Sequence, residues 1–168
     1  MNRLSMVIIT LIVLTSVTGC APIISKSLLR QVNPDVSFEK TFDNPEAVRG
    51  TTVLWGGEIV SIRNLKEGTL LEVLQKSLDI GKKPKRVDNS SGRFLALYDG
   101  FLDGEIYAKG RAVTIAGVVK GRRVQLLDEI EYNYPLIAVK DIHLWEQLSQ
   151  DPTFYHSPYY IWPYHRYW

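Results

Sequence analysis

Cys20 is the residue whose chemistry stands apart, because it is the only cysteine among 168 residues. In an exported protein a lone cysteine can form no internal disulfide, and its thiol stays open to oxidation. The residues before it, Val17, Thr18 and Gly19, are slim enough to let an enzyme reach the sulfur and the neighbouring peptide bond. Alkylation of the thiol to a thioether would remove its reactivity. Cys20 is therefore the first candidate for covalent modification.

The N-terminus predicts export. Arg3 is the only charged side chain ahead of an apolar run of 12 residues from Met6 to Val17. This length matches the hydrophobic region of a signal peptide and falls short of the roughly 20 residues that a membrane-spanning helix needs. The alternative, a buried core helix, would carry an amphipathic stripe, whereas this run is apolar on every side. We expect residues 1–19 to be a cleaved signal peptide.

The segment Val17-Thr18-Gly19-Cys20 resembles the lipobox of bacterial lipoproteins. The resemblance implies a diacylglycerol on the Cys20 sulfur and an N-acyl chain on its amine, and we expect no other cofactor. One acyl chain gives only marginal membrane binding, whereas two or three hold a protein firmly. By the same resemblance Ala21 points to the outer membrane of a Gram-negative bacterium. We favour the periplasmic face over the cell surface.

No other constellation predicts catalysis. The three histidines, His143, His156 and His165, lie near or in the C-terminal tail, and the sequence contains no nucleophile elbow and no GxxxxGK[ST] motif. Two imidazoles in the tail are too few for a metal site by themselves. Four charged residues around the predicted strands are candidates for an ionic site: Arg93, Asp99, Asp103 and Arg111. Charges that flank strand ends are more often solvated or paired structurally, so we expect neither an enzyme nor a metal site.

The C-terminal tail is a candidate contact region, because eight of residues 152–168 are aromatic, three are proline and none is acidic. Tyrosine and tryptophan place an apolar body and a polar tip at a boundary, as they do at membrane interfaces. The residues expected to touch lipid or ligand are Tyr159, Tyr160, Trp162, Tyr164, Tyr167 and Trp168. The alternative is that the tail packs back over the domain as a lid.

Composition limits the partners. Cleavage before Cys20 leaves 149 residues, enough for one domain, and lowers the formal net charge from +2 to +1. A balance so close to zero gives no electrostatic case for nucleic acid. The only basic cluster, residues 82–86, is expected to be a solvated loop.

The elements that follow predict a mainly β fold. Residues 20–36 are expected to be the lipidated N-terminus and a flexible tether, and residues 44–50 a one-turn helix. Strands are predicted at 52–63, 69–75, 93–98, 111–120 and 135–144, with a helical turn at 103–110 and a paired excursion at 124–134. This order is that of an OB-like Greek-key barrel with one or two short helices, spanning residues 37–150 and followed by the tail at 151–168. Trp55 and Ile115 are predicted core residues, and Gly56-Gly57 a bulge or bend.

At this point the sequence resembles the Slp family of outer-membrane lipoproteins over roughly residues 50–145 and the lipobox. The resemblance is carried by VLWGGEI at 53–59, TLLEVL at 69–74, SGRFLA at 91–96, GFLD at 100–103, GRAVTIAG at 110–117, YNYPLI at 132–137 and LW at 144–145. Gly104 departs from the family, where proline is expected. The family implies an envelope protein linked to starvation stress, with no catalytic residues to carry over.

Two functions remain open from the sequence. In the first, the chain is a structural or interaction lipoprotein that contacts other envelope proteins. In the second, the barrel and the aromatic tail bind a glycan or lipopolysaccharide.

Overall fold

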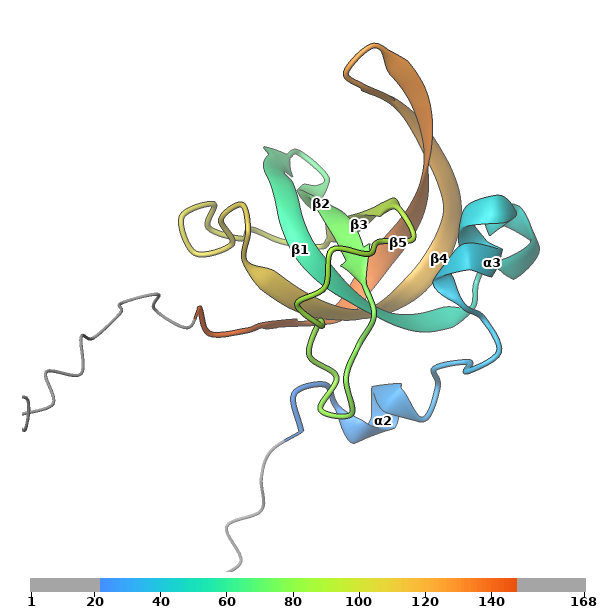
Figure 1. Cartoon of the computed structure of the whole chain (residues 1–168), viewed down its shortest axis with the longest axis vertical. Helices are drawn as coiled ribbons and strands as arrows, with labels where there is room; N and C mark the ends of the chain where they lie inside the picture. Colours follow the sequence, from blue (N-terminus) through green and yellow to red (C-terminus); the bar gives the residue numbers. More distant parts are fainter. Residues whose placement is uncertain (1–21, 148–168) are drawn as a thin grey trace, which may run out of the picture.

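Five strands form a closed barrel in the computed structural model, which describes residues 22–147 (Figure 1). The strands are β1 (Thr52–Leu65), β2 (Gly68–Lys76), β3 (Arg93–Tyr98), β4 (Ala112–Leu127) and β5 (Ile130–Leu144). Their order around the barrel is β1-β2-β3-β5-β4, and every neighbouring pair is antiparallel except β3 with β5. This arrangement confirms the OB-like barrel predicted from the sequence.

The barrel interior is filled by the apolar faces of the alternating strands. Trp55 and Ile115 are buried, as predicted, and they are paired residues on β1 and β4. Phe38 reaches the same core from outside the barrel: its ring centroid lies 5.1 Å from that of Trp55, which lies 5.3 Å from that of Phe94. Both contacts are close to edge-on, the geometry that aromatic quadrupoles favour. The aromatic cluster therefore joins the N-terminal region to the barrel.

Phe38 comes from a helix that the sequence reading did not predict. Helix α3 (Phe38–Asp43) starts at Ser37, whose hydroxyl accepts a hydrogen bond from the Lys40 amide. It leads into the short helix η1 (Pro45–Val48), which confirms the one-turn helix expected at residues 44–50. Asn44 caps that turn, and Gly50 follows with φ of +84°, a conformation that glycine adopts readily. The helical turn expected at 103–110 is a set of turns, with one hydrogen bond from the Tyr107 amide to the Asp103 carbonyl.

Of the bulge or bend predicted at the glycine pair in β1, the register excludes the bulge. The register shift in the β1–β2 pairing falls between Ile59 and Ser61 instead. At Gly56 and Gly57, β1 is paired with β2 on one side and with β4 on the other. A side-chain carbon on Gly57 would collide with the backbone carbonyl of Leu74. The glycines are therefore needed because neighbouring backbone approaches closely there.

Strands β4 and β5 are longer than predicted and continue together beyond the barrel as an arm, here defined as residues 121–135 (Figure 1). The excursion expected at 124–134 is thus paired, and Pro135 lies inside β5, not at its start. The alternating apolar pattern fades here because the arm is exposed, with Leu126 and Ile130 largely in solvent. The backbone pairing of β4 with β5 continues to Leu127 and Ile130 although the alternating apolar pattern does not.

Among residues 22–147, no helix is both long enough and apolar enough to cross a membrane.

Candidate functional site

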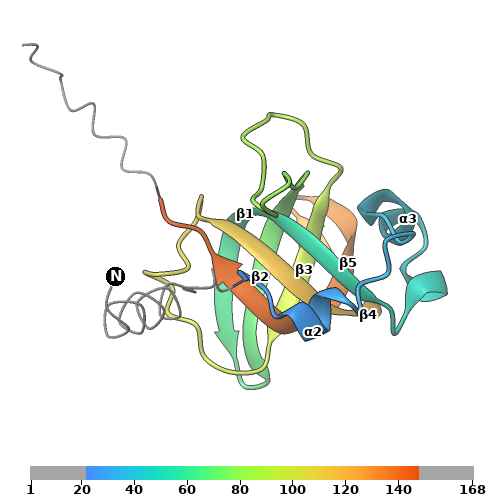
Figure 2. The ribbon, with the colours of Figure 1, turned by 90° about the horizontal axis from the view of Figure 1, so that it is seen from below.

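The N-terminal segment of the described chain is bound to the barrel, so the tether predicted for residues 20–36 is wrong over residues 24–36. Ile24 is fully buried, and the Ser25 amide donates a hydrogen bond of 3.0 Å to the Asp141 carboxylate on β5. After helix α2 (Lys26–Leu29), Val32 forms a bridge with Thr52 at the start of β1. Figure 2 shows α2 lying against the outside of the barrel. A flexible tether was predicted because this segment lacks regular periodicity. A single apolar residue, Ile24, is nevertheless enough to hold it on the barrel.

This contact fixes how far the barrel can move from Cys20. Only residues 21–23 separate Cys20 from the buried Ile24. Four Cα–Cα steps span at most about 14 Å when fully extended. A lipid on Cys20 would therefore hold the α2 side of the barrel close to the membrane surface.

A groove of about 460 Å³ lies beside this segment. One wall is formed by residues 32–39, the other by residues 75–82, and residues 54–56 of β1 form the floor. The second wall belongs to the loop between β2 and β3, residues 77–92, which two contacts hold in place: Lys76 Nζ donates to the Val87 carbonyl at 2.7 Å, and the Thr114 hydroxyl donates to the Lys82 carbonyl at 2.6 Å. The groove is a concave, mixed polar and apolar surface of a size that small ligands occupy.

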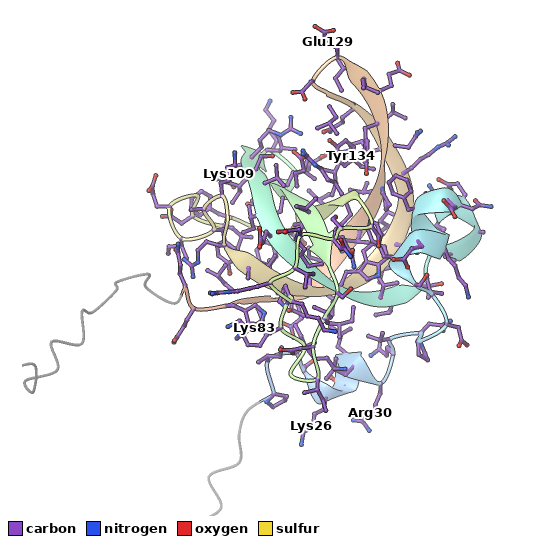
Figure 3. The ribbon with its side chains drawn as sticks, viewed as in Figure 1. Lys26, Arg30, Lys83, Lys109, Glu129 and Tyr134 are labelled. Atoms are coloured by element: carbon purple, nitrogen blue, oxygen red, sulfur yellow. The ribbon has the colours of Figure 1, made fainter. Side chains whose placement is uncertain are left out.

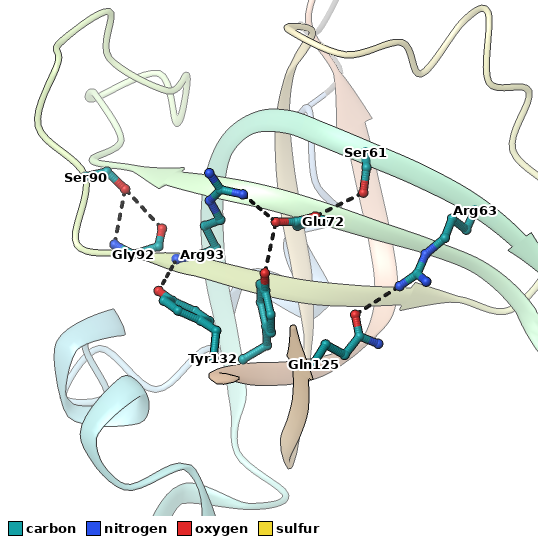
Figure 4. A network of polar contacts seen from close by, with 9 residues as sticks. Ser61, Arg63, Glu72, Ser90, Gly92, Arg93, Gln125 and Tyr132 are labelled. Atoms are coloured by element: carbon teal, nitrogen blue, oxygen red, sulfur yellow. Dashed lines mark hydrogen bonds and ion pairs between the residues drawn. The ribbon is translucent and has the colours of Figure 1, made fainter. Parts of the chain in front are cut away.

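A polar network lies on the outer face of the barrel, centred on the Glu72 carboxylate of β2 (Figure 4). Glu72 accepts hydrogen bonds from three donors: the Ser61 hydroxyl at 3.1 Å, the Arg93 guanidinium at 2.8 Å and the Tyr134 hydroxyl at 3.2 Å. These donors come from β1, β3 and β5. Nearby, the Tyr132 hydroxyl accepts a hydrogen bond from the Arg93 amide at 3.0 Å. One carboxylate thus joins four of the five strands.

Hydrogen bonding and burial raise the pKa values of two members of this network, Arg93 and Tyr134. The hydrogen bond from Arg93 to Glu72 raises the pKa of the guanidinium, so Arg93 stays a cation. Burial raises the pKa of the Tyr134 hydroxyl, and the neighbouring Glu72 charge adds to the effect. Tyr134 packs with Leu70 and Leu95 in a small apolar cluster outside the main core. The network and this cluster hold the base of the arm against β2 and β3.

The network links strands of the barrel through one carboxylate. The Glu72 carboxylate accepts from three protein donors, which occupy most of its acceptor positions. Within residues 22–147, no group of three or more His, Cys, Asp or Glu side chains could hold a metal ion.

The four charged candidates do not form the ionic site considered from the sequence. Arg93 pairs with Glu72, which was not among them, and Arg111 donates to the backbone carbonyls of Ile106 and Trp145. Asp103 accepts from the Glu105 amide, and Asp99 is exposed. Alternation could have placed Glu72 on an outward face, but its partners come from strands whose register the sequence does not reveal.

The remaining candidates lie outside the described residues. These are Cys20 and the six aromatic residues of the tail, Tyr159, Tyr160, Trp162, Tyr164, Tyr167 and Trp168, as well as His156 and His165. The third histidine, His143 on β5, packs edge-on against Trp145 with ring centroids 4.6 Å apart.

Similarity to solved structures is limited to the fold. A small single-stranded DNA-binding protein from Streptomyces coelicolor superposes with a TM-score of 0.37 at 15% identity, covering 56% of this chain and 94% of that one. A mitochondrial single-stranded DNA-binding protein from S. cerevisiae gives 0.36 at 14% identity, covering 58% and 97%. At these scores the OB-like assignment rests on the strand order itself.

Sequence relatives are more informative. The chain is 32% identical to "Outer membrane protein Slp" of Escherichia coli (strain K12) over 114 residues, which are 67% of this chain and 60% of that protein. It is 26% identical to "Uncharacterized lipoprotein YeaY" of the same organism over 155 residues, which are 88% of this chain and 79% of that protein. The alignment with the first relative thus spans less than two thirds of that relative's length.

A family model completes the comparison. The model described as "Outer membrane lipoprotein Slp family" matches residues 17–168, a range that begins at the lipobox and includes the whole barrel. No catalytic family is indicated by this match. The chain belongs to the Slp family of outer membrane lipoproteins.

Proposed function

We propose that this chain is a lipid-anchored, non-enzymatic protein of the cell envelope, linked to starvation or stress, whose barrel is a structural or interaction module at the periplasmic face of the outer membrane. The observation that carries the proposal is the burial of Ile24 on the barrel, only four residues after Cys20. A lipid on Cys20 would position the whole barrel at the membrane, because no long flexible segment intervenes. The family membership supports the same location.

The far end of the molecule supports an interaction role. The arm projects away from the barrel and exposes Val124, Leu126 and Ile130, which are 51%, 69% and 71% accessible. By the strand register Val124 and Leu126 share one face of the arm, and Ile130, the partner of Leu127, lies on the other. Exposed large apolar side chains are a feature of protein contact surfaces. A barrel fixed at the membrane would present this arm to proteins of the envelope.

Co-purification from intact envelopes tests this role. Cells producing the lipidated protein are treated with a reversible cross-linker, and the captured proteins are identified by mass spectrometry. The wild type should retain a defined set of envelope proteins, and Leu126→Ser with Ile130→Ser should reduce their recovery several-fold. The matched control is Lys120→Ser with Arg122→Ser, two exposed residues on the same strand, which should retain them. Recovery no higher than from cells lacking the protein would reject an interaction role.

The groove favours a second candidate function, binding of a glycan or lipopolysaccharide. Its volume of about 460 Å³ and its polar lining, which includes Gln75, Asp79 and Lys82, suit a hydroxyl-rich or phosphate-bearing ligand. Pull-down with lipopolysaccharide and a glycan array, with and without residues 152–168, separates the two functions. Binding that is lost on truncation favours ligand capture by the tail, and binding that survives favours the groove. Absence of binding in both forms favours the interaction role.

A further inference from the structure

The charged residues of the described chain are distributed unevenly along the long axis of the molecule. The segment at residues 22–36 and the loop at residues 77–92 together contain six Lys or Arg residues and three Asp residues. The outer part of the arm, residues 124–134, contains three acidic residues and no Lys or Arg. Figure 3 shows Lys26 and Arg30 at one end of the molecule and Glu129 at the other. The α2 end therefore carries an excess of basic residues, and the outer part of the arm an excess of acidic ones.

The basic end is also the end nearest Cys20. Lys26 and Arg30 are exposed on and just after α2, two and six residues beyond the buried Ile24. Lys82 is exposed on the loop at residues 77–92 and lines the groove across from residues 32–39, the segment that follows Arg30. No hydrogen bond or ion pair within the described chain engages the Lys26 and Lys82 ammonium groups. We define Lys26, Arg30 and Lys82 as the basic face.

Two acidic groups near this face accept backbone amides. The Asp141 carboxylate accepts the Ser25 amide, and the Asp79 carboxylate accepts the Lys83 amide at 2.9 Å. Lys83 itself lies over the Trp145 ring, with its ammonium 5.2 Å from the ring centroid. Arg30 Nε donates to the Lys26 carbonyl, and no ion pair within residues 22–147 involves the three cations of the basic face, so their charges are available to a partner outside the chain.

We propose that the basic face binds the phosphate groups of anionic lipids in the leaflet that holds the Cys20 lipid, and that it sets the orientation of the barrel, with the arm pointing away from the membrane. This inference rests on the proposed lipidation of Cys20. Attraction of a cation to an anionic bilayer falls off within a Debye length, about 8–10 Å at ordinary ionic strength. A connection of at most about 14 Å between Cys20 and Ile24 keeps the basic face within or near that range. The three acidic residues in the outer part of the arm, residues 124–134, are repelled by the same surface, which favours the same orientation.

The lipidated protein offers a clean way to test this orientation. Once lipidated, Cys20 is a thioether, so an introduced cysteine is the only reactive thiol in the chain. A fluorophore is attached in one protein at Ser27→Cys on α2 and in another at Glu129→Cys on the arm. Both proteins are placed in vesicles of phosphatidylcholine with 0 or about 30% phosphatidylglycerol, which also contain a headgroup quencher.

The proposal expects stronger quenching at position 27 than at position 129, and a larger difference with phosphatidylglycerol than without it. Lys26→Glu, Arg30→Glu and Lys82→Glu together should abolish this increase, since each cation near an anionic surface favours binding about fivefold. The matched control reverses three exposed cations elsewhere, Lys109→Glu, Lys120→Glu and Arg122→Glu, and should leave the quenching difference intact.

Flotation of the same vesicles distinguishes a protein that is not anchored from one that is anchored but not oriented. If the proteins do not float with the vesicles, the anchor has failed, and with it both the proposed location and the orientation. If they float but positions 27 and 129 are quenched equally, or if the basic-face variant behaves like the control, the orienting role is overturned while the anchor stands.

Discussion

Glu72 shows how a single side chain can determine the geometry of this barrel. Its side chain is 18% exposed, and that of its ion-pair partner Arg93 is 30% exposed. Through Ser61, Arg93 and Tyr134 it ties β1, β3 and β5 to β2. Hydrogen bonds to a charged, half-buried acceptor are stronger than those between neutral groups at the surface. We therefore attribute to Glu72 the attachment of the arm to the barrel.

Replacement of Glu72 by alanine should lower the free energy of unfolding by about 1–3 kcal/mol, because three donors lose their acceptor. Chemical unfolding followed by tryptophan fluorescence measures the change. The control is Glu67→Ala, since Glu67 pairs with Arg123 at 3.3 Å and is 55% exposed. That variant should stay within about 0.5 kcal/mol of the wild type, as exposed ion pairs contribute little. Equal effects of the two substitutions would contradict the role given to Glu72.

Tyr134 makes the stability depend on alkaline pH. Burial raises the pKa of its hydroxyl in the folded state, so the folded protein holds this proton more tightly than the unfolded chain does. The stabilising contribution is complete below the ordinary tyrosine pKa of about 10 and is lost as the pH rises through the folded-state value. The free energy of unfolding should thus fall less steeply between pH 9 and pH 11 in Tyr134→Phe than in the wild type. Identical slopes would show that Tyr134 does not contribute.

At the scale of one residue, the sequence predicts more about the core than about the network. Strand alternation identified Trp55 and Ile115 as core residues, and both are buried. The same alternation puts Glu72 and Arg93 outward, but it contains no information on which outward residues meet. Tyr134 lies 62 residues from Glu72 in the chain. Only the closed barrel and its register bring them together.

At the scale of the elements, β1 imposes the tightest steric demand. A side-chain carbon at Gly57 would meet the Leu74 carbonyl group and Val73 Cγ1, and backbone cannot yield as a flexible side chain can. Gly57→Ala should therefore lower the free energy of unfolding by about 1–3 kcal/mol or more.

Gly104→Ala is the matched control for this substitution. At Gly104 the nearest atom to an added carbon is Ile62 Cγ2 at 3.6 Å, an ordinary contact. This variant should differ from the wild type by less than about 0.5 kcal/mol. If Gly57→Ala were equally harmless, the close approach of β1 and β2 described here would be wrong.

The elements that the sequence missed share a physical cause. Strands inside the barrel bury one face, so their period of two is visible, and β3 was predicted with its observed bounds. The arm buries few side chains, so its sequence shows no alternation of apolar and polar residues from which the pairing could be predicted. Helix α3 is short, and only two of its residues, Phe38 and Phe42, pack against the barrel core. Two apolar residues are too few to reveal a helical period in the sequence. The N-terminal segment depends on Ile24, a single apolar residue among polar ones.

At the scale of the whole molecule, the two ends of the barrel differ in charge and in exposed apolar surface. The end with α2 and the loop at 77–92 is basic, whereas the outer part of the arm, residues 124–134, contains three acidic residues and exposes apolar side chains. We expect this polarity to present the arm to the space beyond the membrane surface. The family membership gives the location, and the polarity suggests an orientation within it.

The tail at 152–168 is predicted to be dispensable for folding and to contact lipid or ligand. A protein ending at residue 151 should keep the thermal midpoint of the full chain. The fluorescence of Trp162 and Trp168, recorded with Trp55→Phe and Trp145→Phe, should shift to the blue when lipopolysaccharide or vesicles are added. A lid would behave in the opposite way, with a large fall in the midpoint on truncation and no spectral shift on addition of lipid.

The covalent lipid on Cys20 is the central claim, because both the location and the orientation of the barrel depend on it. Cells fed labelled palmitate, followed by membrane fractionation and intact-mass measurement, test it directly. The wild type should incorporate the label, lose residues 1–19 and sediment with the outer membrane, whereas Cys20→Ser should incorporate none. Label in Cys20→Ser at the wild-type level, or a wild-type protein of unmodified mass, would contradict the account.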